Sequence, residues 1–144
     1  MLKRWAANIG AVLAWLLIAV LAMVVLMVGS SLYQVFLRVT LQVSRWSNTL
    51  WVDLYFVFSG LLWLGLVIFT EHLLFNPSAR AGLLVPRALY ICGFEIVLIA
   101  LIQIGLNAYG TFGWFDILMI ALELLVGGLM IWFARRKPRA GIKS

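Results

Sequence analysis

The sequence predicts an all-α integral membrane protein, a four-helix bundle with an amphipathic interfacial helix between its first and second spans. Of the 144 residues, 65% are hydrophobic and only 11% are charged, and the mean hydropathy is +1.11. Soluble domains carry about 25% charged residues. The apolar residues also gather in four stretches that approach or exceed the ~20 residues a helix needs to cross a bilayer. We therefore expect residues 1–144 to form a single transmembrane domain.

The four spans are expected at 5–28, 50–70, 84–106 and 115–134. The first is longer than the roughly 7–15 apolar residues of a signal peptide, so we expect it to be retained as a span. Pro86 suits the first turn of the third span, where its missing N–H costs nothing. The loop between the last two spans is short and uncharged, which predicts an antiparallel hairpin.

The basic residues predict the orientation of the chain. With four spans, both termini lie on one side together with the loop between the second and third spans, and nine of the eleven Lys and Arg residues fall on that side. Only Arg38 and Arg45 fall on the other. Because cytoplasmic loops carry the excess of Lys and Arg, we expect cytoplasmic termini, in a bacterial inner membrane. This placement accounts for the net charge of +6 without a nucleic-acid partner.

The segment 31–48 is too polar for a span and too apolar for a loop. Taken as a helix at 100° per residue, it carries a narrow polar stripe of Gln34, Arg38, Gln42 and Arg45 opposite a broad apolar side. We expect this helix to lie along the outer interface, after a bend in the glycine–serine–serine run before it. The alternative is a long, tilted first span that projects into a partner or into water.

In either case this segment is a candidate docking surface, formed by Arg38, Arg45 and Trp46. Guanidinium groups bind phosphates and carboxylates.

Two acidic residues, Glu95 and Glu123, lie near the middle of the third and fourth spans. A carboxylate in hydrocarbon is costly, so such a residue faces a protein interior, a partner or a wet path. The two spans run in opposite directions, which predicts a similar depth for both glutamates. Asp116 falls on the same side of the fourth span as Glu123, and these three acids form the candidate intramembrane polar, partner or ion site. Gly127 and Gly128 would permit a close helix approach nearby.

Three roles remain open for the two glutamates. They could bind a proton or cation in a transport path, donate hydrogen bonds as neutral acids to partner helices, or pair with basic residues of another subunit. The chain has no basic residue at that depth, so an ion pair would need a partner chain.

A second polar group is expected at the cytoplasmic side, formed by Glu71, His72, Arg80 and Arg87. It is a candidate contact for a lipid headgroup or a partner. One histidine cannot supply bis-histidine haem ligation, and the single cysteine, Cys92, supports neither an internal disulfide nor a metal cluster. We therefore expect no metal site and identify no cofactor, although lipid, quinone or pigment could occupy helix grooves.

The sequence lacks a nucleophile elbow, a P-loop, a zinc-ligand spacing and a Rossmann glycine fingerprint, so an enzyme is not expected. Arg38 follows the first span, Trp51 and Asp53 stand at the start of the second, and Gly65 and His72 come later. This layout, which covers about a third of the chain, resembles the small membrane subunit of tripartite periplasmic (TRAP) transporters, which also has four spans. The resemblance implies an accessory role in transport.

The leading functional hypothesis is a small non-catalytic four-span subunit that scaffolds or stabilises other subunits of a respiratory, photosynthetic or transport complex in the lipid bilayer. The alternatives are a small subunit of a TRAP-type transporter and a homo-oligomeric proton- or cation-coupled transporter. In the last case Glu95 and Glu123 would form the coupling site.

Overall fold

The computed structural model describes residues 2–40, 45–75, 84–110 and 113–136, with side chains described only for 8–39 in the first range and from 49 in the second. These residues form four helices and no strand: α1 (Leu2–Thr40), α2 (Arg45–Phe75), α3 (Leu84–Ala108) and α4 (Trp114–Arg135). All four are long and apolar enough to cross a membrane. The predicted all-helical class with four helices of membrane-spanning length is thus confirmed.

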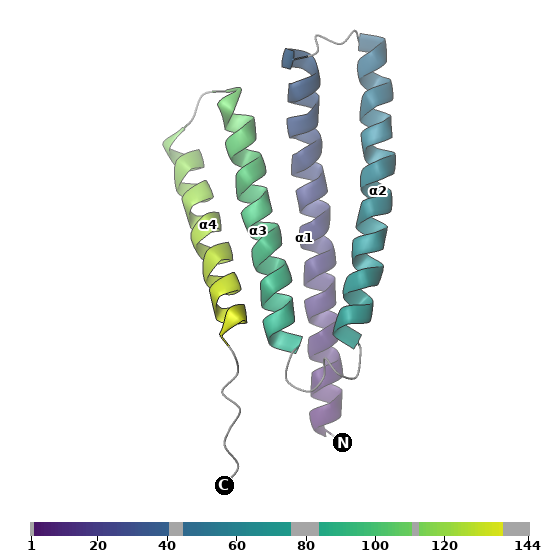
Figure 1. The fold of residues 1–144 in the computed structure, drawn as a ribbon, viewed down its shortest axis with the longest axis vertical. Coiled ribbons are helices and arrows are strands. Elements are labelled where there is room, and N and C mark those ends of the chain that lie inside the picture. Colours follow the sequence, from purple (N-terminus) through teal and green to yellow (C-terminus); the bar gives the residue numbers. More distant parts are fainter. Residues whose placement is uncertain (1, 41–44, 76–83, 111–112, 137–144) are drawn as a thin grey trace.

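The helices stand in a row in the order α2, α1, α3, α4 (Figure 1). The helices α1 and α3 run in parallel, and each pairs with the antiparallel helix that follows it in the chain. The start of α1 and the end of α4 lie at the same end of the molecule, which we call the terminal end; the opposite one is the far end. The helix α1 lies between α2 and α3, and these two helices make few contacts with each other.

The predicted separate helix at 31–48 is not confirmed. Residues 31–40 continue α1 without a break, residues 41–44 lie outside the described part, and Arg45 already begins α2. The alternative of a long first helix fits better, since the 39 residues of α1 extend about 58 Å at 1.5 Å per residue. That length exceeds the ~30 Å hydrocarbon core.

The expected bend is absent because the residues at this point are held from both sides. The Ser30 hydroxyl donates to the Met27 carbonyl oxygen at 2.7 Å, which keeps its hydrogen bond within the helix. Tyr55 of α2 lies against Gly29, where its Oη occupies the space that a Cβ would need. The Tyr33 and Tyr55 rings stack at 4.9 Å just beyond. The contacts of Tyr55 hold this part of the unbroken α1 against α2.

Three aromatic side chains join α1 and α2 by hydrogen bonds to backbone carbonyls. Trp15 Nε1 of α1 donates to the Val67 oxygen at 3.2 Å. In the other direction, Trp63 Nε1 donates to the Ala19 oxygen at 3.1 Å and Tyr55 Oη to the Leu26 oxygen at 3.1 Å. A buried indole or phenol needs such a partner, and these bonds fix the antiparallel register of the pair.

The pair α3 and α4 packs through glycines. A Cβ on Gly93 would lie 2.8 Å from the Gly127 oxygen, and a Cβ on Gly127 would lie 2.8 Å from the Gly93 oxygen. The two backbones therefore touch, as small residues at membrane helix crossings allow. Gly128, by contrast, has open space around its Cβ position, so only one of the two adjacent glycines serves the close approach.

Candidate functional site

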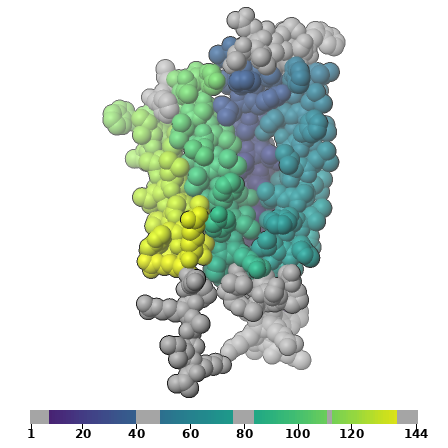
Figure 2. All heavy atoms as spheres, viewed as in Figure 1, coloured from purple at the N-terminus to yellow at the C-terminus, as the bar shows by residue number. Residues whose placement is uncertain are grey.

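A groove lies between α2 and α3 in the described part of the chain, with α1 as its floor. Its volume is about 720 Å³. Figure 2 shows α1 set back between the other two helices. The floor is formed by Ala22, Val25 and Leu26, and the walls by residues of α2 between Phe58 and Phe69 and by Ile91, Phe94, Glu95 and Leu98 of α3. Most of the lining is apolar, and one of the lining residues is a carboxylic acid.

That carboxylate is Glu95, whose side chain is only 4% exposed. Both of its oxygens, Oε1 and Oε2, are buried and have no hydrogen-bond partner in the part of the chain that the structure describes. Helical spacing places it there: Ile91, Glu95 and Leu98 recur at i, i+4 and i+7 and line the groove together. Gly93 faces α4 from the other side of α3. Buried polar groups are almost always paired, so an orphaned carboxylate calls for an explanation.

The second glutamate has a partner in the chain. Gln103 Nε2 of α3 donates to Glu123 Oε1 at 3.0 Å, and this bond joins α3 to α4. The other oxygen, Oε2, is buried and has no hydrogen-bond partner among the described side chains. Sequence reasoning missed Gln103, although an amide inside an apolar span is itself a signal in a hairpin that carries a carboxylate on the other helix.

The structure does not bring the two glutamates into one site. Glu95 lines the groove with α1 and α2, whereas Glu123 is bonded to Gln103. Gln103 lies eight residues beyond Glu95, about 12 Å along the axis of α3. The candidate intramembrane site therefore divides into an orphaned carboxylate in the groove and a carboxylate–amide pair between α3 and α4.

Asp116, the third acid of the predicted site, caps a helix. Its Oδ2 accepts a hydrogen bond from the Gly113 backbone N–H at 3.1 Å, at the start of α4. A negative charge in the first turn is also stabilised by the positive end of the helix dipole. Asp116 thus has a local structural role, one helix turn from the far end and well away from the groove.

The predicted cytoplasmic cluster is only partly described. Arg87 Nη1 donates to the Leu73 carbonyl oxygen at 3.1 Å, so the guanidinium of α3 contacts the last turn of α2. Glu71 and His72 are exposed on α2, and Arg80 lies outside the described residues. This hydrogen bond ties α2 to α3 near the terminal end.

The predicted docking surface is also described in part. Arg38 is exposed near the far end of α1. Arg45 and Trp46 belong to the first turn of α2, but their side chains lie outside the described residues.

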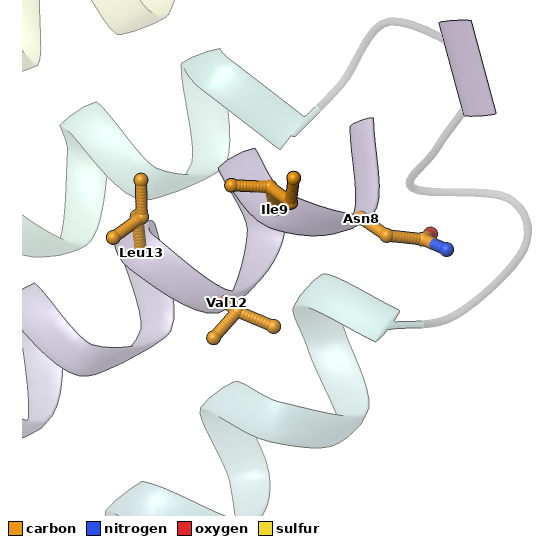
Figure 3. Close-up of a pocket in the computed structure, with 4 residues that line it drawn as sticks. All are labelled: Asn8, Ile9, Val12 and Leu13. Carbon is orange, nitrogen blue, oxygen red and sulfur yellow. The ribbon is translucent and has the colours of Figure 1, made fainter. Parts of the chain in front are cut away.

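Two further features of the described residues bear on ligand binding. No group of three or more His, Cys, Asp or Glu side chains is placed there to hold a metal ion. A hollow of about 280 Å³ near the start of α1 is lined by Asn8, Ile9, Val12 and Leu13 (Figure 3). These side chains come from one face of a single helix, so the hollow lacks the convergent polar groups of a binding site.

Known proteins give no further guide to the site. The chain matches no protein-family model, and searches of curated proteins and of solved structures found no significant match.

Proposed function

We propose that this protein is a small non-catalytic subunit of a larger membrane complex, in which it binds and stabilises other membrane subunits. The supporting observation is Glu95, a buried carboxylate without a hydrogen-bond partner among the described residues. It lies eleven residues beyond the start of α3, about 16 Å from that end, so it is near the middle of a ~30 Å hydrocarbon core. A group this costly to bury is explained by a partner that the complex supplies.

The shape of the molecule supports the same proposal. A helix row that leaves α2 joined almost entirely to α1 offers broad apolar faces to neighbouring subunits. The parent complex would be respiratory, photosynthetic or transporting, and the layout that resembles a TRAP small subunit belongs to the last class. We further propose that the terminal end faces the cytoplasm of a bacterial inner membrane, in accord with the bias of Lys and Arg.

The mass of the native assembly tests this function. The tagged chain is purified from its own membrane in a mild detergent and examined by native mass spectrometry. Foreign subunits in fixed stoichiometry are the expected result, and a monomer or homo-oligomer alone would refute the proposal. A control purification of a tagged, unrelated four-span protein identifies contaminants.

A second candidate function is proton- or cation-coupled transport by a homo-oligomer, favoured by the same orphaned Glu95. Because Glu123 is engaged with Gln103, the coupling group would be Glu95 alone. Glu95→Gln keeps the size and hydrogen bonding of the side chain but removes its titration. If Glu95 couples transport, the native protein in proteoliposomes should show driven flux and the Glu95→Gln variant should not. If Glu95 binds a partner instead, neither protein should show flux.

A further inference from the structure

The groove between α2 and α3 has features of a binding site for another helix. Along α2 its lining extends from Phe58 to Phe69, which is about 16 Å or three helical turns. The wall residues Phe58, Leu62 and Phe69 are 64%, 72% and 63% exposed, so they present large apolar surfaces with nothing packed on them. Van der Waals packing of this kind drives helix association in lipid.

The carboxylate in the groove indicates what the occupant must carry. Glu95 lies near the middle of α3, and its two buried oxygens have no hydrogen-bond partner among the described residues. A lipid acyl chain has no hydrogen-bond donor, and headgroup donors lie at the interface, about 15 Å away in a ~30 Å core. A transmembrane helix can place a Lys, Arg, His, Asn or Gln side chain at this depth.

A second copy of this chain docked through the outward face of α4 would not supply a partner for Glu95. The outward face of α4 presents Leu118, Leu122 and Leu125, which are 63%, 54% and 62% exposed. None of these side chains can donate a hydrogen bond, so a copy docked through α4 would leave Glu95 unpaired.

We propose that this groove receives one transmembrane helix of a different subunit, whose mid-span donor or cation pairs with Glu95. The inference rests on the proposed function, because it names the place and the chemistry by which a partner subunit binds. It requires both an apolar helix face and one polar side chain near the centre of that helix.

Photo-crosslinking in the native membrane tests the occupant. A photoreactive phenylalanine analogue replaces Leu62 in the groove or, as a matched control, Leu125 on α4; both leucines are strongly exposed. The expected result is an adduct from position 62 to a foreign protein, mapped by peptide sequencing to an apolar span with a central donor. Position 125 should not give this adduct. Crosslinks from position 62 to phospholipid only, or to a second copy of this chain, would overturn the proposal.

Two substitutions then test the recognition itself. Glu95→Leu removes the acceptor, and Gly65→Phe fills the groove at a position with open space around its Cβ. Each should reduce the adduct about five-fold or more, as expected when a buried donor loses its partner or the binding site is blocked. Gly128→Phe is the control, because Gly128 also has open space but lies on α4. An undiminished adduct in both groove variants would overturn the proposed binding site.

Once the donor residue of the partner is known, replacing that residue alone by leucine should weaken the complex. Combining this replacement with Glu95→Leu should restore the complex, since removing both members of a buried polar pair is nearly neutral. The mass measurement tests the proposed function, and the crosslinking tests the proposed groove, so the two proposals can be refuted separately. Foreign subunits in the assembly with only lipid adducts at position 62 would keep the proposed function and exclude the groove. An assembly without foreign subunits would refute both.

Discussion

Gly93 of α3 and Gly127 of α4 face each other so closely that neither could carry a Cβ without meeting the other's carbonyl oxygen at 2.8 Å. The Val97 Cγ2 atom adds a second close neighbour to Gly127, also at 2.8 Å from its Cβ position. Backbone at such a crossing cannot yield as a flexible side chain can. This contact therefore fixes how α3 and α4 lie against each other and, through α3, how Glu95 faces the groove.

Alanine at either glycine should destabilise the α3–α4 pair. We expect Gly93→Ala or Gly127→Ala to lower the free energy of unfolding by about 1–3 kcal/mol, because the added methyl forces the helices apart. The measurement is an SDS-unfolding titration of the purified protein in detergent, followed by tryptophan fluorescence. Gly128→Ala is the matched control: its Cβ meets open space, and the helix propensity of alanine should leave stability unchanged or raise it by up to ~1 kcal/mol. Equal losses at Gly127 and Gly128 would contradict the close crossing.

Tyr55→Phe should weaken the α1–α2 pair. It removes the hydrogen bond from Tyr55 Oη to the Leu26 oxygen but keeps the ring that stacks on Tyr33. The expected loss is about 0.6 kcal/mol, the average for a side-chain hydrogen bond between membrane helices. The same titration measures it, with Tyr90→Phe as a control at an exposed tyrosine of α3. A loss at Tyr90 as large as that at Tyr55 would show that the Leu26 bond contributes little.

Asp116→Ala should loosen only the start of α4. The substitution removes the acceptor of the Gly113 N–H bond and the negative charge at the helix N-terminus, at a cost of about 0.5–1 kcal/mol. Hydrogen–deuterium exchange should become faster in the amides of residues 113–117 and stay unchanged in the middle of α4. Faster exchange throughout α4 would indicate that Asp116 supports the helix by another contact.

Cysteines introduced at the two ends of the molecule should be labelled by a thiol reagent from opposite sides of the membrane. Arg38→Cys, near the far end of α1, should react with an impermeant thiol reagent added to intact cells. Arg135→Cys, at the end of α4, should react only after permeabilisation. Native Cys92 is buried, 2% exposed, and provides an unreactive background. The reverse pattern would overturn the proposed cytoplasmic position of the terminal end.

The number of helices and the positions of the spans could be predicted from composition and hydropathy, because a bilayer requires long, uninterrupted apolar stretches. The continuation of α1 through Gly29 and Ser30 could not, because the straight helix depends on Tyr55, a residue 26 positions further along the chain. A glycine–serine run permits a bend without requiring one. Only the neighbouring helix decides between the two.

The candidate site shows the same limit. The sequence predicts a similar depth for Glu95 and Glu123 from their positions in the spans, but rotation about each helix axis sets which neighbours they meet. The glycine crossing fixes that rotation, with Glu123 bonded to Gln103 and Glu95 in the groove. Likewise the positions of Trp15 and Trp63 in apolar spans do not indicate that their indole N–H groups bond α1 to α2.

Replacing Glu95 and replacing Glu123 by leucine should have different effects on the free energy of unfolding. Glu95→Leu in the purified chain without partners should preserve or raise the free energy of unfolding, since a buried unpaired acid costs about 1–3 kcal/mol. Glu123→Leu should lower it by about 1–3 kcal/mol, because the Gln103 amide loses its acceptor inside the membrane. The SDS titration measures both, and Glu123→Leu with Gln103→Leu should recover most of the loss. If Glu95→Leu destabilised the isolated chain as strongly as Glu123→Leu, Glu95 would serve the fold of this chain, and its orphaned oxygens would no longer point to a partner.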